Sequence, residues 1–235
     1  MKTNRKTSKE SKMTVTTPKL IRLAGLSAMV AGIIFAAIAP VSLPVNSSLF
    51  IIITSFKTSI SIFGLLGMTG LYARQVEETG WLGLVGFFLF TGWMTMVCGF
   101  SFVEAFILPK LATESPAFVA GWMGMFSGSP SAVDLGILPT LWNISGPMYI
   151  FGPLLFGIAT FRARVLPRWA GLLLALNIVW VPLGAIVPAE YQPKIMISVG
   201  LAVAWLGYAL FAERHEKASE LAPAYSAKAG ASKAA

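Results

Sequence analysis

The chain has 235 residues, of which 56% are hydrophobic and only 12% are charged, and its mean hydropathy is +0.73. A soluble domain could not bury so much apolar surface, and a disordered regulator or a disulfide-rich secreted scaffold needs a polar majority or many cysteines. The net charge of +8 would suit nucleic acid, but the basic residues lie at the ends of long apolar runs, where they anchor a membrane protein and contact anionic lipid. Composition therefore predicts an integral membrane protein that does not bind nucleic acid.

Six apolar runs are long enough to cross about 30 Å of hydrocarbon, which takes about 20 helical residues. Helices are predicted because no other open structure satisfies its backbone in lipid. The fold class is thus all-α, a polytopic membrane protein with six transmembrane helices in one domain, residues 19–213. Residues 1–18 and 214–235 are predicted to be disordered tails, because they are rich in Ser, Thr, Ala and Lys. The six runs cover residues 20–39, 48–72, 80–108, 138–162, 169–188 and 194–212.

The orientation follows from the basic residues. With the N-terminus in the cytoplasm, fifteen of the 18 Lys and Arg residues fall on the cytoplasmic side, Lys110 and Lys194 fall outside, and Lys57 lies within a span. Basic residues concentrate in the cytoplasmic segments of membrane proteins. Both termini are therefore predicted to be cytoplasmic, and the protein is placed in the inner (plasma) membrane of a prokaryotic cell.

Small residues recur at intervals of four in three of the spans. Such rows allow two helices to approach closely. Because five other helices are present, we expect the rows to pack within the chain rather than to form a dimer face. They are Ala24, Ala28, Gly32 and Ala36 in the first span, Gly171 and Ala175 in the fifth, and Gly200 and Ala204 in the sixth.

The loop 109–137 is predicted to lie outside the cell. Ser115 followed by Pro116 is typical of a helix start, and a short amphipathic run follows. This pattern predicts an interfacial helix resting on the outer leaflet, and a lid over an outward-facing cavity is the functional alternative. Ser131 and Asp134 have the spacing of a capping box, so Asp134 is interpreted as a helix-start residue. The apolar residues of the run are Phe118, Trp122, Met125 and Phe126.

Two charged side chains, Lys57 and Glu104, lie deep within the predicted spans. Intramembrane charge is costly and marks function by default, although an ion pair that fixes the hairpin register is the structural alternative. Further polar residues lie at similar depth on the second to fifth spans, and their shared location predicts a pocket in the outer half of the membrane. The candidate ligand-binding residues are Lys57, Thr58, Ser61, Ser101, Glu104, Asn143 and Asn177.

The inventory of reactive side chains excludes several chemistries. The only histidine is His215 and the only cysteine is Cys98, so bis-histidine haem ligation, imidazole-based zinc or copper sites and dithiol redox relays are excluded. We predict no metal, no cofactor and no catalytic residue. The first hypothesis is binding or transport of a small polar or amphipathic molecule. The second is a non-catalytic accessory or scaffolding subunit, and the third is a lipid-modifying enzyme with Glu104 as general base.

The expected partners are the lipid bilayer, a small-molecule or lipid ligand, and either a second copy of the chain or another membrane protein. One short segment offers a resemblance. The run from Arg162 to Gly171, in which Pro167 and basic residues precede Trp169, resembles a segment of uncharacterised small multi-pass bacterial membrane proteins. The resemblance covers about ten residues and implies a cytoplasmic turn entering a span, with no activity attached.

Overall fold

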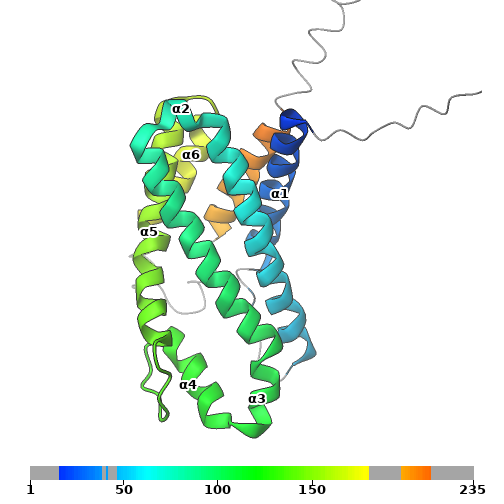
Figure 1. The fold of residues 1–235 in the computed structure, drawn as a ribbon, viewed down its shortest axis with the longest axis vertical. Coiled ribbons are helices and arrows are strands. Elements are labelled where there is room, and N and C mark those ends of the chain that lie inside the picture. The colour runs from blue at the N-terminus through cyan, green and yellow to red at the C-terminus, as the bar shows by residue number, and fades with distance from the viewer. Residues whose placement is uncertain (1–15, 39–40, 42–46, 180–196, 213–235) are drawn as a thin grey trace, which may run out of the picture.

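The computed structural model describes residues 16–38, 41, 47–179 and 197–212, and every regular element among them is an α-helix (Figure 1). Proline stands in the first turn of α3, α4 and α5, where its missing N–H costs nothing. The elements are α1 (Thr17–Ile38), α2 (Ser48–Phe106), α3 (Leu108–Glu114), α4 (Pro116–Ser127), α5 (Leu138–Ala163) and α6 (Arg168–Ala175), and a further apolar helix covers Ile197–Ala212.

Helix α2 folds back on itself (Figure 1). Gln75 and Gly80 leave helical geometry, and Gly80 has a φ of 54°, which a residue with a Cβ rarely adopts. Tyr72 lies before this bend and Phe87 after it, and their rings stack with centroids 4.7 Å apart. α2 therefore consists of two antiparallel arms, residues 48–74 and 81–106, which correspond to the second and third predicted runs.

A buried hydrogen bond ties the bend to α5. Gln75 Nε2 donates to Thr160 Oγ1 over 2.9 Å, and both side chains are fully buried. Gln75 Oε1 makes no hydrogen bond with the described residues. The bond crosses 85 positions of sequence, so it fixes the end of one hairpin against the end of the next.

Three helices, α1, α2 and α5, are long and apolar enough to cross a membrane, and the helices Arg168–Val179 and Ile197–Ala212 are shorter. Each of the six predicted apolar runs contains helix within the described residues. α1 begins at Thr17, so the predicted tail 1–18 is two residues too long. Residues 1–15 and 213–235, with parts of the fifth and sixth runs, lie outside the described residues.

Glycine contacts hold the helices together, as the rows of small residues predict. A Cβ at Gly32 of α1 would lie 2.5 Å from Gly200 O of the helix Ile197–Ala212. Between α5 and α6, a Cβ at Gly157 would lie 2.5 Å from Gly171 O. Backbones at this spacing leave no room for a side chain, so the rows pack within the chain.

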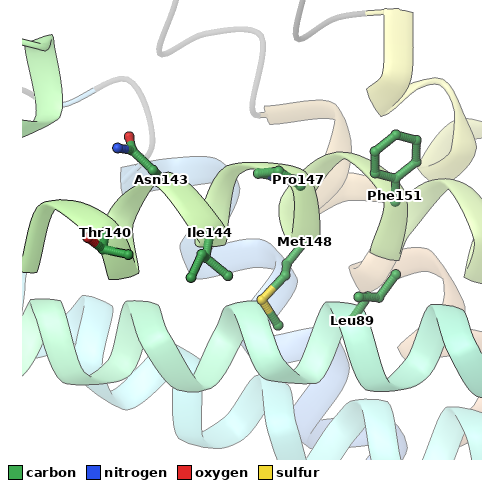
Figure 2. Close-up of a pocket in the computed structure, with 7 residues that line it drawn as sticks. All are labelled: Leu89, Thr140, Asn143, Ile144, Pro147, Met148 and Phe151. Carbon is green, nitrogen blue, oxygen red and sulfur yellow. The ribbon is translucent and has the colours of Figure 1, made fainter. Parts of the chain in front are cut away.

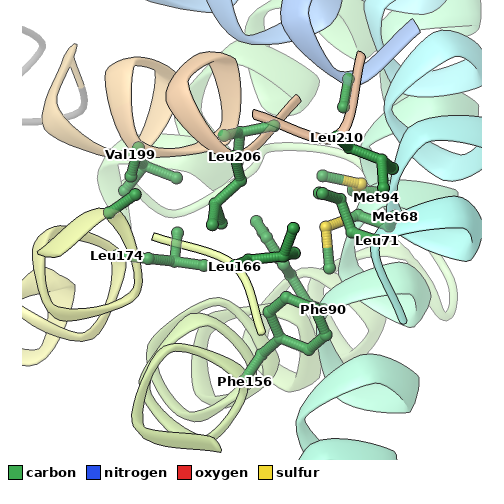
Figure 3. Packing of buried hydrophobic residues seen from close by; sticks show 14 of the residues in the cluster. Met68, Leu71, Phe90, Met94, Phe156, Leu166, Leu174, Val199, Leu206 and Leu210 are labelled. Carbon is green, nitrogen blue, oxygen red and sulfur yellow. The ribbon is translucent and has the colours of Figure 1, made fainter. Parts of the chain in front are cut away.

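The described apolar core has two parts. The larger lies between α1, α2, α5, α6 and the helix Ile197–Ala212, and it includes Phe90, Phe156, Leu174 and Leu206 (Figure 3). The smaller lies at the end of the bundle where α3 and α4 connect α2 to α5 (Figure 1). We call α3 and α4 the cap.

Candidate functional site

The aromatic side of α4 faces the protein. Trp122 is 1% exposed and lies edge-on to Phe100 of α2, with ring centroids 5.7 Å apart, and Phe126 is 4.7 Å from Trp142 of α5. These rings therefore pack against α2 and α5, and the position of α4 at the membrane interface stays a prediction. The cap covers one end of the bundle.

One of the two predicted helix starts of this region is confirmed, since Ser115 is the N-cap residue of α4 and Pro116 begins it. Ser115 precedes α4, but its side chain makes no capping hydrogen bond. Asp134 Oδ1 accepts a hydrogen bond of 2.7 Å from the N–H of Gly136, and Ser131 Oγ accepts from the N–H of Val133 over 3.2 Å. The prediction of a capping box is therefore wrong, because both side chains accept hydrogen bonds within short turns that precede the start of α5 at Leu138.

The hydroxyl groups of Thr58 and Ser61, in the first α2 arm, donate hydrogen bonds to backbone carbonyls of their own helix. Thr58 Oγ1 donates to Thr54 O over 3.1 Å, and Ser61 Oγ donates to Lys57 O over 3.1 Å. A carbonyl one turn earlier is the nearest acceptor for a hydroxyl on a helix in an apolar setting. These bonds use the donor of each hydroxyl and leave only its lone pairs to a ligand.

Lys57 and Glu104 face each other across the α2 hairpin. The two side chains attract electrostatically, and both are half-buried. Cys98 Sγ lies 3.9 Å from Thr58 O, which sets the register of the two arms at this level. The described part of the chain shows no direct ion pair between Lys57 and Glu104, so the ammonium and the carboxylate lie close together without touching.

Two further polar groups join this region. Trp122 of the cap lies near the Glu104 carboxylate, and its indole N–H makes no hydrogen bond to any described residue. Ser101 is buried on the same side of its helix as Glu104, one turn away. We call Lys57, Ser101, Glu104 and Trp122 the sub-cap cluster.

The two asparagines lie elsewhere. Asn177 is 1% exposed and donates from Nδ2 to Tyr149 O over 2.9 Å, which ties the chain after α6 to α5. Asn143 is exposed on α5. The structure places two of the predicted residues, Asn143 and Asn177, away from the others. The remaining five lie on the two arms of the α2 hairpin: Lys57, Thr58, Ser61, Ser101 and Glu104.

Asn143 lines a groove between the second arm of α2 and α5 (Figure 2). The groove has a volume of about 440 Å³ and an open side. Ile144 and Met148 point from α5 toward α2, where Leu89 faces them (Figure 2). Gly92 makes room for the end of Met148, because a Cβ there would collide with its methyl group. The lining residues are Leu89, Thr140, Asn143, Ile144, Pro147, Met148 and Phe151.

Of the candidate ligand-binding residues, only Asn143 lines this groove. Apart from Thr140, its other lining residues are apolar and of a kind present on every span, so the sequence carried no distinguishing signal. The large side chain of Met148 packs over Gly92, which has none, and this pairing can be recognised only once the positions of α2 and α5 are known. No family model, curated protein or solved structure matches the chain.

Proposed function

We propose that this chain is a six-span protein of a prokaryotic inner membrane, with both termini in the cytoplasm, that binds an amphipathic, lipid-like molecule in the groove between α2 and α5. The observation that carries the proposal is the open groove of about 440 Å³ between two helices that are long and apolar enough to cross a membrane. Its size falls in the range of small-molecule sites.

The dimensions of the groove suit one hydrocarbon chain. Its lining on α5 runs from Thr140 to Phe151, which at 1.5 Å per residue is about 16 Å. This length is about half of the roughly 30 Å of hydrocarbon in a bilayer. The groove therefore has the length of the hydrocarbon of a single leaflet.

The polarity of the groove is graded along α5. The polar lining residues, Thr140 and Asn143, lie in the first turns of α5, and the positions farther along the helix are apolar. An amphipathic molecule matches this gradient, with its polar end at Asn143 and its chain along Ile144 and Met148.

A matched pair of substitutions tests the proposal. Ile144→Trp fills the groove, and Ile62→Trp places the same ring on the first arm of α2, at a position equally exposed, 50% against 49%. After mild solubilisation, mass spectrometry should find a recurrent amphipathic molecule with the parent protein and the Ile62 variant, and should find it depleted with the Ile144 variant. Equal retention by both variants would refute the groove as the site. Thermal unfolding of both variants controls for folding.

One observation favours the second hypothesis, an accessory or scaffolding subunit. Glycine contacts between helices and hydroxyls bonded to their own helix, such as Thr58 and Ser61, account for these residues without a ligand. The same purification separates the two hypotheses. A recurrent membrane-protein partner without a recurrent small molecule favours the accessory role.

A further inference from the structure

The turn between α5 and α6 carries three exposed arginines within seven residues. Arg162 lies in the last turn of α5, Arg164 ends that helix with a φ of 56°, and Arg168 begins α6. None of the three forms an ion pair with a residue that the structure describes, although Glu77 and Glu78 are exposed in the bend of α2, which Gln75 ties to Thr160 of α5. The turn therefore presents three exposed guanidinium groups that form no ion pair with the described acidic residues.

Two tryptophans lie at the same end of the bundle. Trp169 is 55% exposed, and the guanidinium of Arg168 lies 5.1 Å from its ring centroid. Trp81 follows the bend of α2 and is 81% exposed. Exposed tryptophans are enriched at the headgroup level of a bilayer, and guanidinium groups bind phosphate oxygens in a two-pronged geometry. The opposite end of the described chain carries Lys110, Glu114 and Asp134 and has no comparable group of cations.

We propose that Arg162, Arg164 and Arg168 form a binding site for the phosphate headgroup of an anionic phospholipid, with Trp169 beside it at the membrane interface. Charge complementarity selects this partner, because the turn has three positive charges and no acidic residue. The site is separate from the groove, which begins in the first turns of α5 at the other end of that helix.

The test uses the purified full-length protein with an equimolar mixture of phosphatidylglycerol and phosphatidylcholine, and native mass spectrometry counts the lipids retained. The parent protein should retain phosphatidylglycerol preferentially, and higher salt should weaken the preference. Replacing all three arginines by glutamine should reduce the preference by about fivefold per residue, because each basic residue near an anionic surface contributes by about that factor.

Three control variants make the result decisive. Replacement of the three arginines by lysine keeps the charge and loses the two-pronged geometry, so it should retain more of the preference than glutamine and less than arginine. Lys110→Gln at the opposite end should leave the preference unchanged. Ile144→Trp should also leave it unchanged, so that failure of the groove and failure of this site are distinguishable. A preference that survives the glutamine variant would overturn the proposal. An acidic protein that copurifies through these arginines, without any lipid preference, would overturn it as well.

Discussion

A methyl group added at Gly32 tests whether close backbone contact holds α1 against the helix Ile197–Ala212. The new Cβ would lie 2.5 Å from Gly200 O and 2.9 Å from Ala204 Cα, and neither backbone atom can rotate away. Overpacking of this kind costs about 1–3 kcal/mol. The matched control is Gly99→Ala in the second arm of α2, where no atom lies within 4 Å of the new Cβ. There the same change should stabilise the helix by about 1 kcal/mol.

The assay is thermal unfolding of both variants in the same detergent. The gain in helix propensity is common to both variants, so their free energies of unfolding should differ by the overpacking cost of about 1–3 kcal/mol. About 2–4 °C of Tm corresponds to each kcal/mol in a chain of this size. Gly32→Ala should therefore unfold about 2–12 °C below Gly99→Ala. Equal transition temperatures for the two variants would refute the close contact between α1 and the last described helix.

Two further predictions concern topology and the sub-cap cluster. With the native cysteine replaced, Pro130→Cys should react with an impermeant thiol reagent in intact cells and Arg164→Cys only after lysis; labelling of position 164 from outside would contradict the orientation. Both positions are exposed, as labelling requires. Lys57→Met and Glu104→Gln should each lower the free energy of unfolding, and the double variant should recover about 0.5–3 kcal/mol of the summed loss. Strictly additive losses would show that the two charges do not interact.

Hydrophobic pattern predicted the helices because a single physical requirement decides them. An apolar run of about 20 residues in lipid must satisfy its own backbone, so neighbouring side chains hardly affect the outcome. The rows of small residues predicted the helix packing, because Gly32 and Gly200 have no side chain to separate two helices. Local chemistry also set the bend of α2, where Gly80 adopts a positive φ.

The orientation of the cap and the position of the groove could not be predicted because they depend on contacts between distant segments. The apolar side of α4 suits lipid and protein equally well as a pattern, and only the position of Phe100 and Trp142 opposite Trp122 and Phe126 decides between them. Asn177 suggested a binding group, but Tyr149 O, 28 positions away, already accepts its N–H.

The polar residues of the α2 arms were easier to find than to interpret. Lys57 and Glu104 were recognised because a charged side chain within a membrane is energetically costly. In the structure the two charges attract each other across the hairpin without forming a direct ion pair. The hydroxyls of Thr58 and Ser61 suggested a pocket from composition alone. Their bonds to carbonyls of the same helix show that part of this polarity is satisfied locally.

Photo-crosslinking from within the groove tests the central claim, that it holds an amphipathic molecule, most directly. A benzophenone amino acid is placed at Met148, which lines the groove, and at Ile62, which is exposed on the first arm of α2 and does not line it. After irradiation of intact cells, mass spectrometry should find one recurrent amphipathic adduct at position 148 and the bulk lipid mixture at position 62. The same lipid mixture at both positions, or a protein adduct at position 148, would contradict the claim.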